Sequence, residues 1–318
     1  MQNYLIGIDI GRTNIKIGAL DHKNKSVFPL KSYKFQTMDS AYAELSVNVI
    51  QRIRQYMNEH NISHSQLGGI GVSLPALFNR ENGKIVRWPN NRLWDGLEFR
   101  DLVINEFNVP LVMEDDANCA ALGESFNGNA NGFNHYAYIT VSSGIGCGIV
   151  LNGEIYHGAS GWAGELGHTL FYGEKVSCNC GNKGCIQALS SGVAIFSTIR
   201  NKLSEYEKAK YNELEEIIRK SDNRNEINLA LNQAALFLSY SIFNLYMILD
   251  LQLIIIGGGV VKIGSLFTNP LTENFEKLLE NVGRTCQVLF TDRETENGIY
   301  GALMLIQKKL HNIKSYPG

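Results

Sequence analysis

The chain has 318 residues, of which 44% are hydrophobic and 19% charged, and its formal net charge is −2. This length and balance predict two globular domains with a large core, and the near-neutral charge argues against nucleic acid as a partner. The first residues, 1–7, lack a basic segment followed by a long apolar stretch, so we expect no signal peptide and a cytoplasmic protein.

The first half of the chain alternates apolar strand patterns with amphipathic helix patterns. We predict strands at 4–10, 15–19 and 27–35, a helix at 41–58, a strand at 68–74, a helix at 97–107, a strand at 110–113 and a helix at 117–126. Asp115 or Asp116 stands where the last of these helices would begin.

The second half repeats this plan from its own start. We predict strands at 135–142 and 147–151, helices at 191–203, 212–220 and 226–249, a strand at 253–256, a helix at 266–281, a strand at 287–290 and a helix at 298–310. Parallel strands interleaved with helices imply an α/β fold. We expect an N-terminal lobe of residues 1–115, to which 300–318 return, and a C-terminal lobe of residues 116–299.

One helix pattern is long enough to span a bilayer, because residues 227–249 contain no charged side chain. Polar residues nevertheless recur along it, among them Asn228, Asn232, Gln233 and Asn244. This pattern favours a helix buried inside a large soluble protein, with no membrane as partner.

Two glycine turns occupy equivalent positions in the two halves, Asp9-Ile10-Gly11-Arg12-Thr13 and Ser142-Ser143-Gly144-Ile145-Gly146. Successive backbone N–H groups in such turns can hold a phosphate, and the first turn joins two strands, which argues against a Walker loop. Asp9 could hold Mg²⁺ through water, and Thr13 and Ser143 can donate hydroxyl groups. Either turn alone is equally well explained as a tight hairpin without a ligand, but the pair favours phosphate binding.

Two further segments carry candidate chemistry. Gly257-Gly258-Gly259 follows a strand, where three glycines leave room for a nucleotide or simply allow a close helix–strand contact. Glu114, Asp115 and Asp116 place three acids at a strand end, which suits either helix capping or a general base that accepts a hydroxyl proton.

Three of the six cysteines cluster as Cys178, Cys180 and Cys185, ten residues after His168. Cys₃His is a tetrahedral zinc set without an open position, so such an ion would be structural. The alternative is a core histidine beside unrelated thiols. We expect the scattered Cys119, Cys147 and Cys286 to be buried thiols.

In order, these motifs resemble the ROK family (repressors, open reading frames and kinases) over nearly the whole chain. The matching segments are the first glycine turn (D-I-G-G-T), residues 142–146 (G-T-G-I-G), 165–168 (E-x-G-H), 178–185 (C-x-C-G-x-x-G-C) and 256–259 (I-G-G-G).

The resemblance implies a two-lobed actin-like fold, with a mixed sheet flanked by helices in each lobe, that phosphorylates a hexose with Mg-ATP, typically at the 6-hydroxyl. It implies Asp116 as the general base, Asn90, Asp115, Glu165, His168 and Gln187 at sugar-contacting positions, and a homodimer or homotetramer. The phosphate-binding positions are Asp9, Gly11, Arg12, Thr13, Ser143, Gly144 and the glycine triplet.

The sequence departs from the family pattern at five positions. Arg12 replaces a glycine, Asp115 an asparagine and Gln187 a glutamate, while Ser142 and Ser143 stand for glycine and threonine. Two alternatives therefore stay open: a repressor, which would need a helix-turn-helix ahead of the strand that starts at Tyr4, and a sugar sensor with weak turnover. The motifs do not identify the hexose; glucose, allose and N-acetylmannosamine are all used in the family.

Overall fold

The structure is a computed structural model that describes residues 3–11, 13–35, 42–88, 92–171 and 173–315. The chain folds into two compact units, unit 1 (residues 1–131 and 295–318) and unit 2 (residues 132–294). The expected boundary at Asp115 therefore falls inside unit 1, because the helix that follows it packs within that unit.

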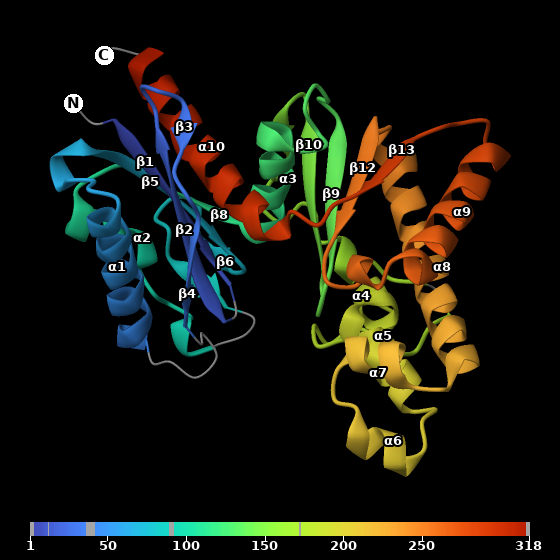
Figure 1. Cartoon of the computed structure of the whole chain (residues 1–318). Coiled ribbons are helices and arrows are strands. Elements are labelled where there is room, and N and C mark those ends of the chain that lie inside the picture. Colours follow the sequence, from blue (N-terminus) through green and yellow to red (C-terminus); the bar gives the residue numbers. More distant parts are fainter. Residues whose placement is uncertain (1–2, 12, 36–41, 89–91, 172, 316–318) are drawn as a thin grey trace. The chain divides into compact units, whose positions relative to one another are not determined.

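Unit 1 is built on a mixed sheet (Figure 1). Its strands are β1 (Tyr4–Ile10), β2 (Asn14–Asp21), β3 (Ser26–Val27), β4 (Lys31–Lys34), β5 (Leu67–Leu74) and β8 (Leu111–Asp115). The order is β3-β2-β1-β5-β8, with β4 also pairing with β2. β1 and β2 are antiparallel, whereas β1, β5 and β8 are parallel. The single third strand predicted at 27–35 is wrong: β3 and β4 are separated by residues 28–30, where Pro29 has no N–H to donate to a ladder.

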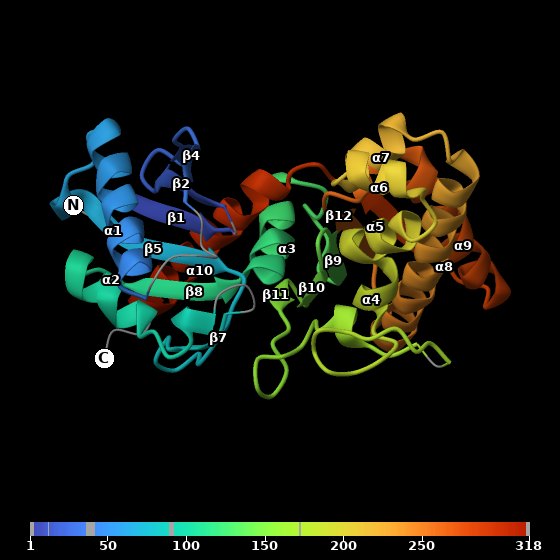
Figure 2. The ribbon, with the colours of Figure 1, turned by 90° about the horizontal axis from the view of Figure 1, so that it is seen from below.

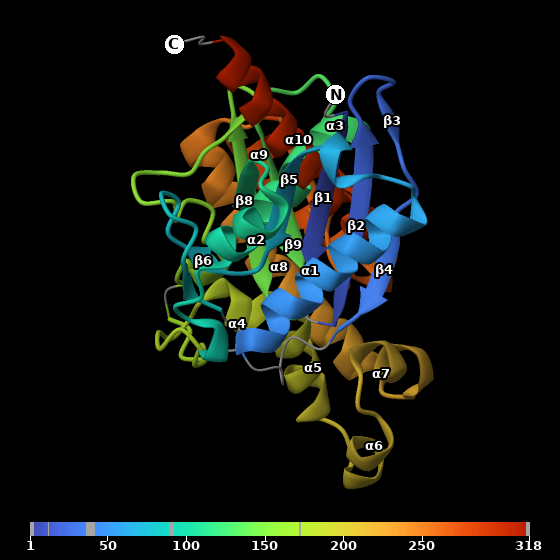
Figure 3. The same cartoon turned by 90° about the vertical axis from the view of Figure 1, so that its left-hand side faces the viewer.

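Helices cover both faces of this sheet. In Figure 3, α1 (Tyr42–Glu59) and α2 (Phe99–Phe107) lie in front of the strands, and α10 (Glu294–Ser315) lies behind them. The side chains of β1 alternate accordingly, since Ile6, Ile8 and Ile10 join the core with α1 and α2 while Leu5 packs on α10.

The approach of α10 is very close. A Cβ added to Gly71 of β5 would lie 1.9 Å from the carbonyl oxygen of Ala302, and one added to Gly301 would lie 1.9 Å from that of Cys119. The second contact joins α10 to α3 (Asp116–Asn127), so both helices belong to unit 1. Glycine is required here by space, because any side chain would separate the backbones.

Unit 1 also contains elements that the sequence patterns did not predict. They are a ribbon of β6 (Leu77–Phe78) and β7 (Ile85–Arg87), and two short 3₁₀ turns at His64–Gln66 and Arg92–Trp94. The ribbon is too short to show a periodicity, yet the loop between its strands reaches the site described below.

Unit 2 repeats the sheet of unit 1. Its strands are β9 (Tyr136–Val141), β10 (Ile145–Leu151), β11 (Glu154–Ile155), β12 (Leu253–Gly257) and β13 (Gln287–Phe290). They lie in the order β11-β10-β9-β12-β13 with β9 and β10 antiparallel and β9, β12 and β13 parallel. The predicted internal repeat is confirmed at the level of strand order and direction.

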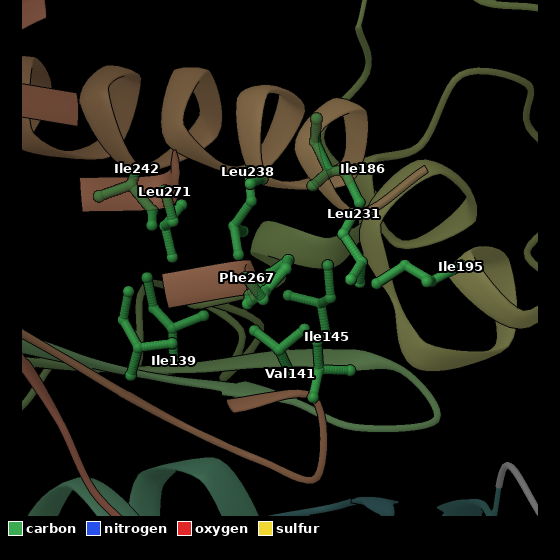
Figure 4. Close-up of a cluster of buried hydrophobic side chains, with 14 of the residues drawn as sticks. Ile139, Val141, Ile145, Ile186, Ile195, Leu231, Leu238, Ile242, Phe267 and Leu271 are labelled. Atoms are coloured by element: carbon green, nitrogen blue, oxygen red, sulfur yellow. The ribbon is translucent and has the colours of Figure 1, made fainter. Parts of the chain in front are cut away.

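One face of this sheet carries the core of unit 2. The helices are α4 (Ile186–Ser190), α5 (Gly192–Arg200), α6 (Glu205–Lys210), α7 (Leu214–Lys220), α8 (Arg224–Leu249) and α9 (Ser265–Asn281). α8 and α9 lie side by side (Figures 1 and 2). Figure 4 shows Ile139 and Val141 of β9 pointing toward Leu238 of α8 and Phe267 of α9.

α8 is the helix predicted over 226–249. Its buried residues include Leu231, Leu238 and Ile242, which face the sheet, while Leu229 and Ile248 are exposed. Among the helices of the described residues, none is both long and apolar enough to span a membrane.

Candidate functional site

Four polar side chains form a row where the parallel strands β1, β5 and β8 end and the antiparallel strand β2 begins. Asp9 of β1 is the register partner of Lys16 on β2 and of Ser73 on β5, and Ser73 is in turn the partner of Glu114 on β8. Register partners project from the same face of a sheet, so these side chains lie next to one another. The carboxyl ends of parallel strands are where open α/β sheets bind ligands.

Asp9 is held by both of its neighbours. Ser73 Oγ donates a hydrogen bond to Asp9 Oδ1 at 2.9 Å, and Lys16 Nζ lies 3.5 Å from Asp9 Oδ2. Burial raises the pKa of the Asp9 carboxyl, while Lys16 and Ser73 act in the opposite direction. The side chain keeps 14% of its surface exposed, so Asp9 is not fully sealed from solvent.

The three adjacent acids have different surroundings. Asp115 is the N-cap of α3, and its side chain accepts a hydrogen bond from the Ala117 N–H at 3.0 Å. Asp116 is the first residue of that helix and is half-buried. Capping of α3 is therefore the role of Asp115.

Glu114 is the buried member of the trio, with 2% of its surface exposed. Arg80, from the loop between β6 and β7, donates two parallel hydrogen bonds to its carboxylate at 2.8 and 2.9 Å. Glu114 also accepts from the Asp115 N–H and from Asn118 Nδ2. The Arg80–Glu114 pair thus fixes the strand-to-helix junction that carries Asp115 and Asp116.

Sequence reasoning missed the Arg80–Glu114 pair. The acidic trio was a signal for Glu114, but nothing in the sequence indicates that Arg80, 34 residues earlier, is its partner.

The first glycine turn closes between β1 and β2. The Gly11 N–H donates to the Asn14 carbonyl at 2.9 Å, and Asn14 Nδ2 donates to Thr13 Oγ1 at 2.9 Å. Thr13 is exposed, as a phosphate ligand would be. Arg12 of this turn and the predicted sugar contact Asn90 lie outside the described residues.

The second glycine turn lies between β9 and β10 and is tied to three other segments of unit 2. Ser142 donates its N–H to the Gly144 carbonyl at 2.9 Å, and its own carbonyl accepts from the Gly192 N–H at the start of α5 at 2.7 Å. Ser142 Oγ accepts from the Gly259 N–H at 3.0 Å. Ser143, at the tip, is exposed.

The glycine triplet adjoins this turn through the Ser142 hydroxyl. A Cβ on Gly258, whose φ is +108°, would lie 2.1 Å from the Val141 carbonyl oxygen, so only glycine fits there. A Cβ on Gly259 would meet nothing within 4 Å. The close contact predicted from the sequence therefore exists at Gly258, but with the end of strand β9 and not with a helix, and Gly259 lies beside open space.

Gln187 of α4 completes the support of the second turn. Its Oε1 accepts a hydrogen bond from the Ile145 N–H at 3.0 Å, and a Cβ on Gly144 would lie 2.7 Å from the same oxygen. The Gln187 oxygen is therefore engaged with the backbone of the second turn.

The predicted zinc ligands come together. One ligand atom from each of His168, Cys178, Cys180 and Cys185 lies within 4.8 Å of every other. The Cys180 and Cys185 sulfurs are 3.5 Å apart, near the ~3.8 Å that a tetrahedron of ~2.3 Å Zn–S bonds requires and far beyond a disulfide bond. The donor set and its spacing fit a zinc ion.

A tight hairpin brings these ligands together. Leu170 bridges to Cys185 and Ser177 to Lys183. Gly184 has a φ of +78°, and a Cβ there would lie 2.9 Å from two carbonyl oxygens. A backbone hydrogen bond from Asn182 lowers the pKa of Cys180 to about 6, whereas burial raises that of Cys185. Of the scattered cysteines, Cys119 and Cys147 are buried as expected and Cys286 is half-buried.

His168 presents its two ring nitrogens to different partners. Nδ1 lies 3.8 Å from the Cys178 sulfur, and Nε2 lies 3.9 Å from Glu165 Oε2. Metal-bound histidines commonly direct the other ring nitrogen toward a carboxylate, which fixes the ring. The Glu165 side chain is 48% exposed, so it can approach His168 and still reach a ligand.

The chain is similar to known proteins along nearly its whole length. The model of the ROK family matches residues 5–309. A glucokinase of Halalkalibacterium halodurans is 28% identical over 98% of this chain and 97% of its own. A xylose repressor of Caldicellulosiruptor bescii is 26% identical over 85% of this chain and 69% of its own.

The fold is shared with solved structures. A ROK family glucokinase from Streptomyces griseus, in complex with glucose and AMPPNP, superposes with a TM-score of 0.78 at 23% identity, covering 96% of this chain and 99% of its own. The actin-like fold expected from the sequence motifs is thereby confirmed. The chain belongs to the ROK family.

Proposed function

We propose that this protein transfers the γ-phosphoryl group of ATP to a hydroxyl group of a hexose or hexose derivative, at the 6-hydroxyl. One observation carries the proposal. Unit 1 has carboxylates at the ends of its parallel strands, and unit 2 has glycine turns at the equivalent strand ends. Phosphoryl transfer to a hydroxyl needs a proton acceptor and a set of phosphate-binding donors. Membership of a family whose relatives include glucokinases supports it.

Asp116 is the proposed general base. It would accept the proton from the sugar hydroxyl as that oxygen attacks the γ-phosphorus and the bond to the leaving ADP oxygen breaks. Asp116 stands at the position that the family resemblance gives to the base. Its neighbours have other roles in the structure, because Asp115 caps α3 through one oxygen and Glu114 is paired with Arg80.

Unit 2 is proposed to bind the nucleotide. The exposed Ser143, the tip glycine Gly144 and the open space beside Gly259 offer hydroxyl and N–H donors that can approach phosphate oxygens closely. Ser142 joins the glycine turn to the triplet, so both segments would hold their geometry while a phosphate binds. In unit 1, the exposed Thr13 is the corresponding donor.

A bound Mg²⁺ ion would neutralise part of the phosphate charge. Asp9 is proposed to hold this ion through water. Lys16 and Ser73 orient the Asp9 carboxylate for that role. The Cys₃His group would hold zinc with no open position, so its proposed contribution is to order the loop that carries Glu165 and His168. Both residues, with Asn90, Asp115 and Gln187, are the proposed sugar contacts.

A sugar sensor with weak turnover is the second candidate. It is favoured by the similarity to xylose repressors and by the engagement of the Gln187 oxygen with the protein's own backbone. The two functions differ in one observable, which is the release of ADP.

The deciding experiment is a coupled ADP-release assay with Mg-ATP against glucose, allose, mannose and N-acetylmannosamine. We expect one sugar to give turnover well above the ATP-only background, and Asp116→Asn to abolish it. If calorimetry shows that a sugar binds but no sugar gives ADP release from ATP, the kinase proposal is refuted and the sensor is favoured.

We also expect the protein to be a homodimer or homotetramer, which sedimentation analysis would test.

A further inference from the structure

The zinc group and the second glycine turn are connected through one short helix. Cys185, a predicted zinc ligand, is the N-cap of α4, and Gln187 is the second residue of that helix. The far end of α4 is anchored separately, because Ser190 Oγ donates to the Ala234 carbonyl of α8 at 2.9 Å. The position of Gln187 is therefore set from both ends of α4, at one end by the segment that Cys185 begins and at the other by the Ser190 anchor.

The contact of Gln187 with the turn has a defined orientation. The Ile145 N–H can only donate, so its partner must be the carbonyl oxygen of the amide, at 3.0 Å. That oxygen also fills the space above Gly144, where a Cβ would lie 2.7 Å from it. Gln187 thus fixes the backbone at the tip and exit of the turn.

We propose that Gln187 is a positioning residue that couples the Cys₃His group to the phosphate-binding turn, so that zinc occupancy raises the affinity for ATP. The inference rests on the proposed function, since it takes residues 142–146 to bind nucleotide phosphates. It goes beyond a zinc ion that merely orders the sugar-binding loop.

The expected size of the coupling follows from the other supports of the turn. Gly192 and Gly259 hold Ser142 by bonds that do not involve α4, so loss of the Gln187 bond should loosen the turn without collapsing it. A single intramolecular hydrogen bond changes an equilibrium about 3- to 10-fold. Binding couplings are reciprocal, so the nucleotide should raise zinc affinity by the same factor.

The test is a thermodynamic cycle on the full chain with AMPPNP as the probe, measured by calorimetry. Chelation of zinc from the wild type should raise the Kd of AMPPNP about 3- to 10-fold. Gln187→Ala should show the weaker Kd already when loaded with zinc, and chelation should not raise it further. Gln187→Glu should behave like the wild type, because a carboxylate oxygen also accepts from the Ile145 N–H. Gln233→Ala, on an exposed position of α8, is the matched control.

A second measurement avoids the metal-free protein, because zinc removal is linked to unfolding. Zinc transfer to a chromophoric chelator is followed with and without AMPPNP. AMPPNP should slow the transfer and reduce its extent in the wild type and Gln187→Glu, but not in Gln187→Ala. Equal effects of AMPPNP on the wild type and Gln187→Ala would overturn the coupling while leaving the kinase proposal intact.

Two other outcomes are equally decisive. If Gln187→Ala weakens hexose binding and leaves AMPPNP binding unchanged, Gln187 is a sugar contact and not a positioning residue of the turn. If the zinc-loaded wild type does not bind AMPPNP at all, the nucleotide role of residues 142–146 fails, and the proposed kinase function fails with it.

Discussion

Units 1 and 2 share a strand order and strand directions, yet the same edge of the two sheets carries opposite chemistry. In unit 1 the strand ends bear Asp9, Glu114 and Asp115, which are acceptors. In unit 2 the equivalent ends bear Ser142 and the glycine triplet, which present backbone N–H and hydroxyl donors. One topology therefore supports a row of carboxylates at the strand ends of unit 1, here called the acidic edge, and a row of hydrogen-bond donors at the strand ends of unit 2, here called the donor edge.

The two edges are also stabilised in different ways. Carboxylates brought together need counter-charges and hydrogen bonds, and unit 1 supplies Lys16, Ser73 and Arg80 from other elements. Backbone donors need a chain that can pack closely and is held in place. In unit 2, Gly258 allows the close packing, and the Gln187 side chain holds the turn by accepting a hydrogen bond from it. The difference predicts that removal of the counter-charge Arg80 destabilises the first edge and that added side-chain volume destabilises the second.

The largest expected effect is on catalysis in unit 1. Asp116→Asn should lower kcat by about 10²- to 10⁴-fold, because the amide keeps the shape of the carboxylate but cannot accept a proton. Hexose binding, followed by calorimetry, should change little. Retention of more than half of the wild-type kcat would show that another group is the base.

In unit 2 the corresponding large effect is on the metal. The purified protein should contain about one zinc ion per chain. Cys180→Ser should lose it and lower the free energy of unfolding by about 3 kcal/mol or more, because metal binding is linked to folding. Cys286→Ser, outside the cluster, should keep the zinc. Metal analysis of freshly purified wild type that finds none would refute the site.

The Arg80–Glu114 pair tests how the acidic edge is held. Arg80→Ala leaves Glu114, 2% exposed, without its counter-charge, and should lower the free energy of unfolding by about 3 kcal/mol. The exposed Arg54–Glu106 pair is the control, because Arg54→Ala should lower it by less than about 1 kcal/mol. Urea unfolding measures both, and equal losses would mean that Glu114 is adequately solvated without Arg80.

Two neighbouring glycines test the donor edge. Gly258→Ala forces a side chain into a φ of +108° and against the Val141 carbonyl, and should lower the free energy of unfolding by about 2 kcal/mol. Gly259→Ala meets no atom within 4 Å and should change it by less than about 0.5 kcal/mol. If Gly259 lies beside bound phosphate, this second variant should nevertheless raise the KM for ATP.

The smallest expected effect is the pH dependence linked to Asp9. Its pKa is raised by burial, so the folded protein holds this proton more tightly than the unfolded chain does. The ionised carboxyl therefore disfavours folding above its folded pKa, and this penalty disappears as the pH falls toward the unfolded pKa. Asp9→Asn should be more stable than the wild type at pH 7, and the difference should shrink on acidification. A difference independent of pH would exclude Asp9 as its source.

Much of this molecule was determined by local sequence. The apolar periodicity of 41–58 and 226–249 gave helices α1 and α8, and the two glycine turns gave the repeated antiparallel strand pairs, because side-chain spacing and turn geometry act within a few residues. The grouping of Cys178, Cys180 and Cys185 could also be predicted from the sequence, since their spacing fits a short hairpin. Family membership followed from the order of such motifs.

Only the tertiary structure decided which distant residues became partners. It joined Arg80 to Glu114, set Ser73 beside Asp9, and turned the Gln187 oxygen onto the Ile145 N–H. It also divided the acidic trio into a buried ion-pair member, a helix cap and a half-buried first residue of α3. Periodicity cannot reveal these pairings, because they depend on strand register and on short elements such as β6, β7 and α4, which carry no repeat of their own.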